Sequence, residues 1–407
     1  MAIKLNFQKK GAMTIAALLC AAVSQCAGLI ASVRPGFDPT LLGATFGVRL
    51  DDSIPNSTFH YYYVADIEQI HVIQAAMAAH PGIEWVEDDK DILAPESTNG
   101  KGGSIPQLRK VPISVQYTSG GHYGQNLNWV SKIGWTIPED VYSRPVRVAV
   151  LDTGLSPHQP LLWANVVASM TAIPREVNAW DIRSGRPGTR SYDPNGALGH
   201  GTMVTSLIAM LAPEAELVVC RVADSAGYSS AWKVIKGIVF AVNQDCELAN
   251  ISLGSLDQLP AVGEILDWAD TQGLQVIAAI GNDSLEEAIY PSRYSKAIAI
   301  SGVDPDDKKA SFSNWHGTAD MSAPATGIVG ADWNGRMMTW HGTSFAAPIV
   351  TGCVAQSLRL RTRLSPDNLR NRIEGVGVNI DPLNPLYENK LGPRVSFPLL
   401  EQAILNP

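Results

Sequence analysis

The sequence predicts an α/β domain, in which a parallel sheet is flanked by helices on both faces, preceded by a small α+β domain. From residue 111 to residue 407, short apolar runs alternate with helical patterns, which favours a parallel sheet covered on both sides. Two of these runs, Val148–Leu151 and Ile277–Ile280, are apolar at every position and lead to a polar side chain beside a glycine. Such runs are typical of strands buried on both faces.

The smaller domain is expected before residue 94. Its predicted elements are strands at Phe59–Val64 and Ile83–Glu87 and, between them, a helix at Ile67–Ala79 with apolar residues at three- and four-residue steps. Residues 94–110 are rich in proline, glycine and serine, a composition typical of a linker. We therefore assign residues 25–110 to the first domain with its linker, and residues 111–407 to the second.

The N-terminus has the layout of a secretory signal. Three lysines precede an apolar run that ends near Ser24, so residues 1–24 are predicted to be a signal peptide and the protein to be secreted. No charged residue lies between Gly11 and Val33, which leaves a membrane anchor through residues 11–33 as an alternative.

The net charge limits the possible partners of the protein, and the cysteine count leaves the pairing of its thiols undecided. The chain has a net charge of -8, which argues against nucleic acid as a general partner. Residues 111–407, the expected mature region, hold three cysteines, Cys220, Cys246 and Cys353, so at least one is unpaired. Buried free thiols are the favoured interpretation, with a Cys220–Cys246 bridge as the alternative.

Three polar residues stand where catalytic chemistry is often placed. Asp152 ends an apolar run, His200 opens a helical pattern between two glycines, and Ser344 lies at the expected start of another helix. Alone, each is more simply explained as a cap or turn residue, since such residues commonly satisfy free backbone groups. Together they match a carboxylate that orients a base, the base, and a nucleophile.

The segments around these residues resemble the subtilisin-like serine proteases, or subtilases. The resemblance is carried by Asp-Thr-Gly from Asp152, His-Gly-Thr-x-Val from His200, and Gly-Thr-Ser-x-Ala-x-Pro from Gly342, and it extends from about Trp129 to about Leu360. It implies a subtilisin-like fold and a serine endopeptidase that acts on proteins or peptides as a monomer. Ser206 and Phe345 depart from the usual pattern, but neither departure removes a catalytic group.

The resemblance also assigns binding residues. Asn282 corresponds to the side chain that, with the Ser344 N–H, donates to the oxyanion of the tetrahedral intermediate. Two segments correspond to the walls of the substrate groove, where an extended backbone is added as a strand. The groove residues expected from them are Gly227, Ser252, Leu253 and Gly254.

The first domain is expected to be a propeptide that inhibits the enzyme. His80–Glu87 is similar to propeptides of the kexin branch, and the cut is expected near Arg109-Lys110. No cofactor is required. Calcium is common in the family, but the acidic group Asp304, Asp306 and Asp307 has no reliable ligand spacing, so no metal residue is assigned.

Two alternatives remain open. A processing protease that cuts after basic residues is favoured by the kexin-like propeptide and by the acidic loop Asp283, Glu286 and Glu287. A catalytically silent subtilase fold used for binding is opposed by the complete triad. Ile289 occupies a position that is commonly small in subtilisins, which favours a shallow pocket and an apolar residue such as Ala, Val or Leu before the scissile bond.

Overall fold

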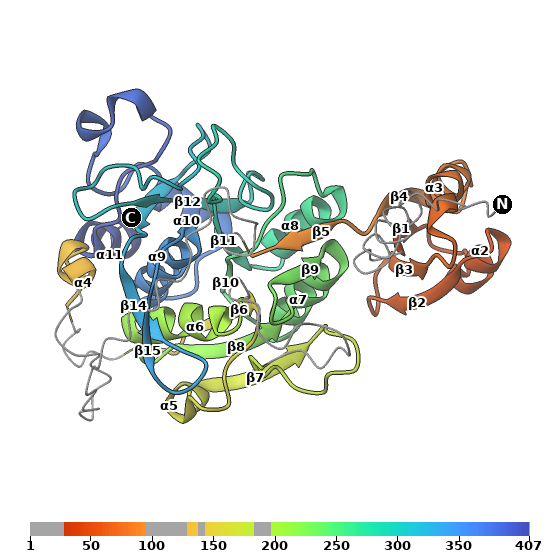
Figure 1. Ribbon diagram of the computed structural model, residues 1–407, viewed down its shortest axis with the longest axis horizontal. Coiled ribbons are helices and arrows are strands. Elements are labelled where there is room, and N and C mark those ends of the chain that lie inside the picture. Colours follow the sequence, from red (N-terminus) through yellow and green to blue (C-terminus); the bar gives the residue numbers. More distant parts are fainter. Residues whose placement is uncertain (1–27, 95–127, 137–142, 183–196, 407) are drawn as a thin grey trace, which may run out of the picture. The chain divides into compact units, whose positions relative to one another are not determined.

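The computed structural model describes residues 28–94, 128–136, 143–182 and 197–406. Contacts within the chain separate it into two compact units, with the division between Asp91 and Ile92 (Figure 1). The predicted signal peptide and the Arg109-Lys110 site lie outside the described residues.

The first unit is a small α+β fold with an antiparallel sheet in the order β2-β3-β1-β4. Its strands are β1 (Gly28–Val33), β2 (Arg49–Ser53), β3 (Phe59–Tyr63) and β4 (Ile83–Asp88). Its helices are α2 (Pro39–Thr45), the 3-10 turn η1 (Ile67–Gln69) and α3 (Ile70–Ala78). The expected strand–helix–strand pattern is present, with the helix opening on a 3-10 turn. Because Gly28–Val33 is a strand paired on both sides, the alternative anchor cannot extend over residues 28–33 as a helix.

The second unit contains a seven-stranded parallel sheet in the order β13-β12-β11-β10-β6-β8-β7. Its strands are β6 (Arg147–Asp152), β7 (Val166–Thr171), β8 (Glu216–Arg221), β10 (Leu248–Ile251), β11 (Gln275–Ala279), β12 (Ala297–Val303) and β13 (Met321–Pro324). Every residue of β10, β11 and β12 is buried, as the continuous apolar runs predicted.

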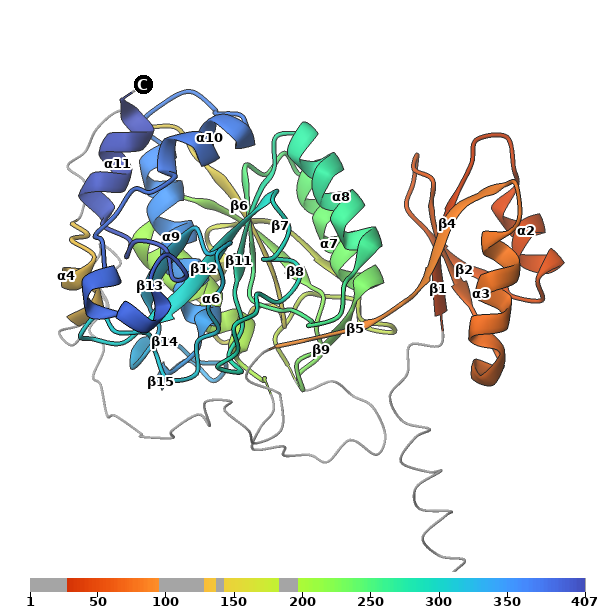
Figure 2. The same ribbon diagram turned by 90° about the horizontal axis from the view of Figure 1, so that it is seen from above.

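Helices cover both faces of this sheet (Figure 2). On one face lie α6 (His200–Leu211) and α9 (Thr343–Leu358), and on the other lie α7 (Ala231–Asn243) and α8 (Pro260–Thr271). The predicted α/β architecture is therefore confirmed. The remaining elements are α4 (Asn128–Lys132), α5 (Pro160–Trp163), α10 (Pro366–Ile373), α11 (Phe397–Leu405), β5 (Asp91–Leu93), β9 (Tyr228–Ser230), β14 (Ile328–Ala331), β15 (Met337–Trp340), η3 (Asp381–Leu383) and η4 (Pro385–Tyr387).

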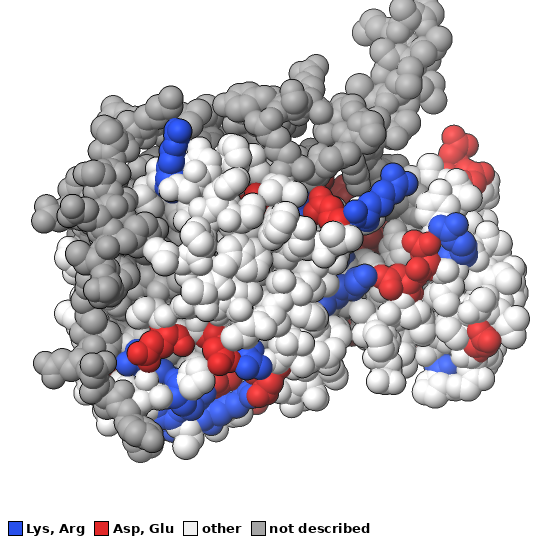
Figure 3. Space-filling view, turned by 90° about the horizontal axis from the view of Figure 1, so that it is seen from below, with Lys and Arg blue, Asp and Glu red and all other residues white. Residues whose placement is uncertain are grey.

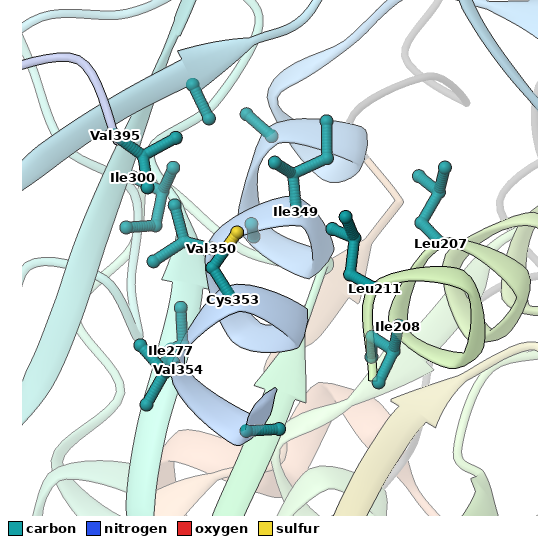
Figure 4. Close-up of a cluster of buried hydrophobic side chains, with 14 of the residues drawn as sticks. Leu207, Ile208, Leu211, Ile277, Ile300, Ile349, Val350, Cys353, Val354 and Val395 are labelled. Atoms are coloured by element: carbon teal, nitrogen blue, oxygen red, sulfur yellow. The ribbon is translucent and has the colours of Figure 1, made fainter. Parts of the chain in front are cut away.

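The central element of the core is α9, all 16 residues of which are buried. In Figure 4 its side chains lie between the sheet residues Ile277 and Ile300 on one side and the α6 residues Leu207, Ile208 and Leu211 on the other. A helix without a polar, solvent-facing side is expected where it is enclosed by protein, as α9 is along its whole length.

Three further observations concern the thiols, the membrane and the surface. Cys220, Cys246 and Cys353 are free and buried, so the alternative Cys220–Cys246 bridge is not formed.

Among the described residues, no helix has the length and apolar character needed to cross a membrane. On the face shown in Figure 3, acidic and basic side chains of the described residues lie close to one another.

Candidate active site

The four predicted catalytic residues come together at one edge of the parallel sheet. Asp152 is the last residue of β6, and Asn282 follows β11, which is separated from β6 by β10. Helices α6 and α9 begin with His200 and with Thr343-Ser344. The carboxyl ends of parallel strands form the usual place for ligand chemistry in open α/β sheets.

Asp152 and His200 form a buried pair. The distance from His200 Nδ1 to Asp152 Oδ1 is 2.7 Å, and neither residue is exposed. Asp152 Oδ1 also accepts from the Thr153 N–H at 2.7 Å, while Oδ2 is buried without a hydrogen-bond partner among the described residues. Since a carboxylate can only accept, the proton lies on Nδ1, and Nε2 is left as the basic nitrogen of the ring.

Glycines allow helix α6 to begin against the Asp152 turn. A Cβ atom on Gly201 would lie 2.4 Å from the Gly154 carbonyl oxygen, so no larger residue fits after His200. The Gly201 N–H donates to Thr153 Oγ1 at 2.9 Å. Gly199 precedes the helix with a φ of 92°, a conformation that favours glycine. Close packing therefore requires a glycine directly after His200.

Ser344 is tied to the groove residue Ser252. Pro348 lies inside α9 and has no N–H, so the Ser344 carbonyl cannot accept the usual bond from four residues ahead. Ser252 Oγ takes that place and donates to the Ser344 carbonyl at 2.8 Å. In the other direction, Ser344 Oγ donates to the Ser252 carbonyl at 3.3 Å.

Two aromatic rings lie beside the imidazole of His200. The ring of Phe345 lies 5.4 Å from that of His200, and the ring of Trp340 lies 6.2 Å from it, measured between centroids. Phe345 is fully buried, so this departure from the family pattern is a packing residue beside His200. Sequence reasoning did not identify Trp340, whose position depends on the β14–β15 hairpin.

Asn282 is held with a defined orientation. Its Oδ1 accepts from both the N–H and the hydroxyl of Thr343, at 2.9 and 2.8 Å. Because the oxygen end of the amide faces these two donors, the –NH2 end of the side chain is directed away from Thr343. Asn314 stabilises the same loop, since its Oδ1 accepts from the N–H groups of Asp283 and Leu285. Neither Thr343 nor Asn314 was identified as a positioning residue from the sequence.

The predicted groove walls bind a segment of the second unit itself. Leu93 and Gly254 exchange two backbone hydrogen bonds, of 3.0 and 2.9 Å, in an antiparallel bridge. The Ala94 N–H donates to the Gly227 carbonyl at 2.9 Å. Gly227 and Gly254 therefore act through their backbones, whereas the side chain of Leu253 is fully buried in the protein.

Ile289 packs directly against Gly254. A Cβ atom on Gly254 would lie 2.3 Å from Ile289 Cδ1, so the isoleucine side chain lies directly on this glycine. The neighbouring acidic residues are partnered: Glu286 pairs with Lys390 at 2.5 Å, and Glu287 pairs with Arg293. Burial raises the pKa of the third, Asp283.

No metal site is found among the described residues. No group of three acidic, histidine or cysteine side chains there is arranged to hold an ion. In the loop considered for calcium, Asp307 pairs with Lys132 and Arg394, and Asp304 accepts from backbone N–H groups of the loop. These residues do not fit a calcium site.

Comparison with known proteins agrees with this geometry. Residues 143–375 match the model of the subtilase family, which is more than half of the chain. The chain belongs to the subtilase family. It is a serine-type endopeptidase of that family, in keeping with its similarity to characterised proteases.

Three relatives of this subtilase illustrate the extent of the similarity. Subtilisin Savinase of Lederbergia lenta is 31% identical over 60% of this chain and 88% of its own length. Subtilisin E of Bacillus subtilis (strain 168) is 30% identical over 76% of this chain and 74% of its own length. The alkaline protease of Alkalihalobacillus alcalophilus is 31% identical, and the alignment spans 62% of its length. The resemblance of the first unit to kexin propeptides stays a prediction.

Proposed function

We propose that this subtilase is the precursor of a secreted endopeptidase in which Ser344 is the nucleophile, His200 the general base and Asp152 the residue that orients the base. The observation that carries the proposal is the buried 2.7 Å bond between Asp152 and His200. It leaves Nε2 of the imidazole able to accept the serine proton. Secretion is supported by the leader pattern of residues 1–24.

In the proposed reaction, Ser344 Oγ turns from the Ser252 carbonyl to His200 and attacks the substrate carbonyl carbon. His200 takes the serine proton and then gives it to the leaving amine, which releases the first product. Asp152 stabilises the imidazolium that forms between these steps. Water then hydrolyses the acyl-enzyme by the same proton transfers in reverse.

The oxyanion of the tetrahedral intermediate is proposed to bind the Asn282 amide and the Ser344 N–H. The support for Asn282 is its orientation, because Thr343 engages Oδ1 and directs the –NH2 end away. Ser344 lies in the first turn of α9, and the N–H groups of a first turn point out of the helix start. Donors fixed before the reaction require no reorganisation as charge develops.

We further propose that the enzyme prefers a small or medium apolar residue before the scissile bond. Ile289 supports this preference, because its side chain fills space directly beside Gly254. The processing alternative requires an unpaired negative charge to bind Lys or Arg. Its two best candidates, Glu286 and Glu287, each already pair with a basic side chain.

The groove contacts support the proposal that residues 25–110 are an inhibitory propeptide. Leu93 pairs with Gly254 in antiparallel register, and the Ala94 N–H donates to the Gly227 carbonyl, so this segment pairs with the predicted groove walls as an added strand. The cut is expected near Arg109-Lys110, and sequencing the N-termini of maturing forms tests it.

The test of the catalytic proposal is labelling with a fluorophosphonate, combined with peptide hydrolysis. The wild-type mature enzyme should incorporate one label and cleave peptides, and Ser344→Ala should do neither. Ser357→Ala is the matched control, because this buried serine lies in the same helix and donates to the Cys353 carbonyl. Turnover by Ser344→Ala, or no labelling of a folded wild-type enzyme, would contradict the proposal and favour a silent fold.

A further inference from the structure

A second buried carboxylate, Asp181, holds the start of the helix that carries His200. Its Oδ1 accepts from the Gly199 N–H at 3.2 Å. Its Oδ2 accepts from the N–H and the hydroxyl of Thr202, at 3.3 and 2.8 Å. Gly199 and Thr202 lie on either side of His200, so a single side chain fixes the backbone before and after the base.

The helix start is fixed from its other side by the Asp152 turn. The Gly201 N–H donates to Thr153 Oγ1, and the Thr202 hydroxyl accepts from the Ser156 N–H at 2.9 Å. The first N–H groups of a helix have no partners within it, so these side chains determine how the first turn is oriented. Within the described residues, Asp181 supplies the only carboxylate in this set.

Arg221 contacts the backbone next to each of the two carboxylates. It ends β8 directly beside Asp152 in the register of β6 and β8, and its side chain is fully buried. The guanidinium donates to the Thr153 carbonyl and, at 3.2 Å, to the Ile182 carbonyl. Arg221 thus contacts the residue after Asp152 and the residue after Asp181.

The charged groups around Asp181 come from several elements. Among the residues that the structure describes, they include Arg221 on β8, Asp152 on β6, His200 on α6, and Glu176, which follows β7 and pairs with Arg221 at 2.5 Å. Burial raises the pKa of Asp181 to about 6, against the opposing effects of Thr202, Gly199 and Arg221, while Asp152 raises it further. The carboxylate is therefore ionised at neutral pH and becomes protonated under mildly acidic conditions.

We propose that Asp181 is a positioning residue for His200, because its ionised carboxylate orients the first turn of α6 and hence the imidazole toward Ser344. This inference rests on the catalytic roles proposed above. A protonated Asp181 has one acceptor fewer and carries a donor that faces the N–H groups of the helix. Its protonation should therefore lower turnover in addition to the protonation of His200 itself.

The primary test is the pH dependence of kcat/KM for the mature wild-type enzyme, which requires no variant. Asp181 and His200 must each lose a proton before the enzyme is fully active. The acid limb of log kcat/KM plotted against pH should therefore have a slope clearly above one. Asp181→Asn should show an acid limb of slope one. Its kcat at pH 8 should fall by about 10- to 100-fold, the effect expected when a catalytic group is misplaced, with KM changed by less than about twofold.

Asp270→Asn is the matched control for a loss of stability alone. Asp270 is a buried carboxylate on α8 that pairs with Lys296 and Arg370, away from the site residues. This variant should lower the thermal midpoint and keep the wild-type pH profile. If Asp181→Asn does not fold, Thr202→Val provides the test, since it removes the hydroxyl that donates to Asp181 and should lower kcat without raising KM.

The results separate this inference from the proposed function. The role of Asp181 is overturned, and the triad is left intact, if two results are found together. The wild-type enzyme is active, is labelled by the fluorophosphonate and has an acid limb of slope one. The substitution Asp181→Asn or Thr202→Val leaves this pH profile unchanged. A folded wild-type enzyme with no turnover overturns the triad and the inference together.

Discussion

Ser252 and Ser344 are joined by two hydrogen bonds that run in opposite directions, each from the hydroxyl of one residue to the carbonyl of the other. The bond to the Ser344 carbonyl depends on Pro348, which cannot supply the helical N–H. The segment that follows β10 and the first turn of α9, which carries the proposed nucleophile, are therefore fixed to each other.

Ser252→Ala should destabilise the protein by about 1–3 kcal/mol, because it leaves the buried Ser344 carbonyl without its partner. Pro348→Ala should restore part of this loss when added to Ser252→Ala, since it supplies an N–H four residues after Ser344. Urea unfolding of the two single variants and the double variant measures both effects. A double variant no more stable than Ser252→Ala would show that the two residues do not compensate each other.

Asn282→Ala should lower kcat by about 10²–10³ with little change in KM, the effect typical of one oxyanion-hole donor. Thr343→Val should cause a smaller loss, because it removes one of the two donors that orient the amide and keeps the backbone N–H. Steady-state kinetics on one peptide tests both variants. An effect on KM alone would indicate that Asn282 binds the ground state.

Ile289→Gly should remove the side chain that packs on Gly254 and so enlarge the expected pocket for the residue before the scissile bond. For substrates with Phe rather than Ala at that position, kcat/KM should increase by at least about 10-fold, because the space of several methylene groups becomes free. Lys390→Ala is the informative comparison, because it releases Glu286 from its ion pair and should increase cleavage after Arg. A wild-type enzyme that already prefers Arg strongly would favour the processing alternative.

The charge on Asp181 should cost stability at neutral pH. An unfolded carboxyl group has a pKa of about 3.9, whereas burial raises the pKa of Asp181 to about 6, so the folded chain binds more protons between these values. Stability from this group is therefore lost as pH rises through that window. Relative to wild type, Asp181→Asn should gain about 2 kcal/mol in unfolding free energy between pH 4 and pH 7. A difference that is constant with pH in urea unfolding would contradict this expectation.

Leu93→Pro should weaken inhibition of the mature enzyme by the purified 25–110 fragment, because proline removes the N–H that donates to the Gly254 carbonyl. We expect an increase of about 10-fold in the inhibition constant, as for one backbone hydrogen bond lost in the groove. Leu93→Ala keeps the N–H and is the control. Equal inhibition by the Pro and Ala fragments would mean that the groove pairing does not contribute to binding.

Much of the fold followed from local patterns. The apolar runs that predicted β6 and β11 are buried on both faces, and the glycines around His200 occur where helix α6 begins in tight contact with its neighbours. The prediction of free buried thiols also agrees with the structure. These features depend on periodicity and on short-range sterics, which neighbouring residues specify.

The acidic loop shows what local patterns could not reveal. From sequence, Glu286 and Glu287 favoured binding of a basic substrate residue, but in the structure they pair with Lys390 and Arg293. Lys390 is 104 positions from Glu286 in the chain, so its effect on the charge of this loop follows from tertiary packing alone.

By itself, the sequence determined the class of fold, the order of its elements and the identity of the candidate triad, because residue type and spacing encode buried strands, helix starts and chemical groups. Tertiary structure alone decided the contacts that orient those groups: Asp181 and Arg221 around the His200 helix, Thr343 and Asn314 around Asn282, and Leu93 in the groove. Such contacts join distant segments through directional hydrogen bonds, and no local pattern in the chain specifies which segments will meet.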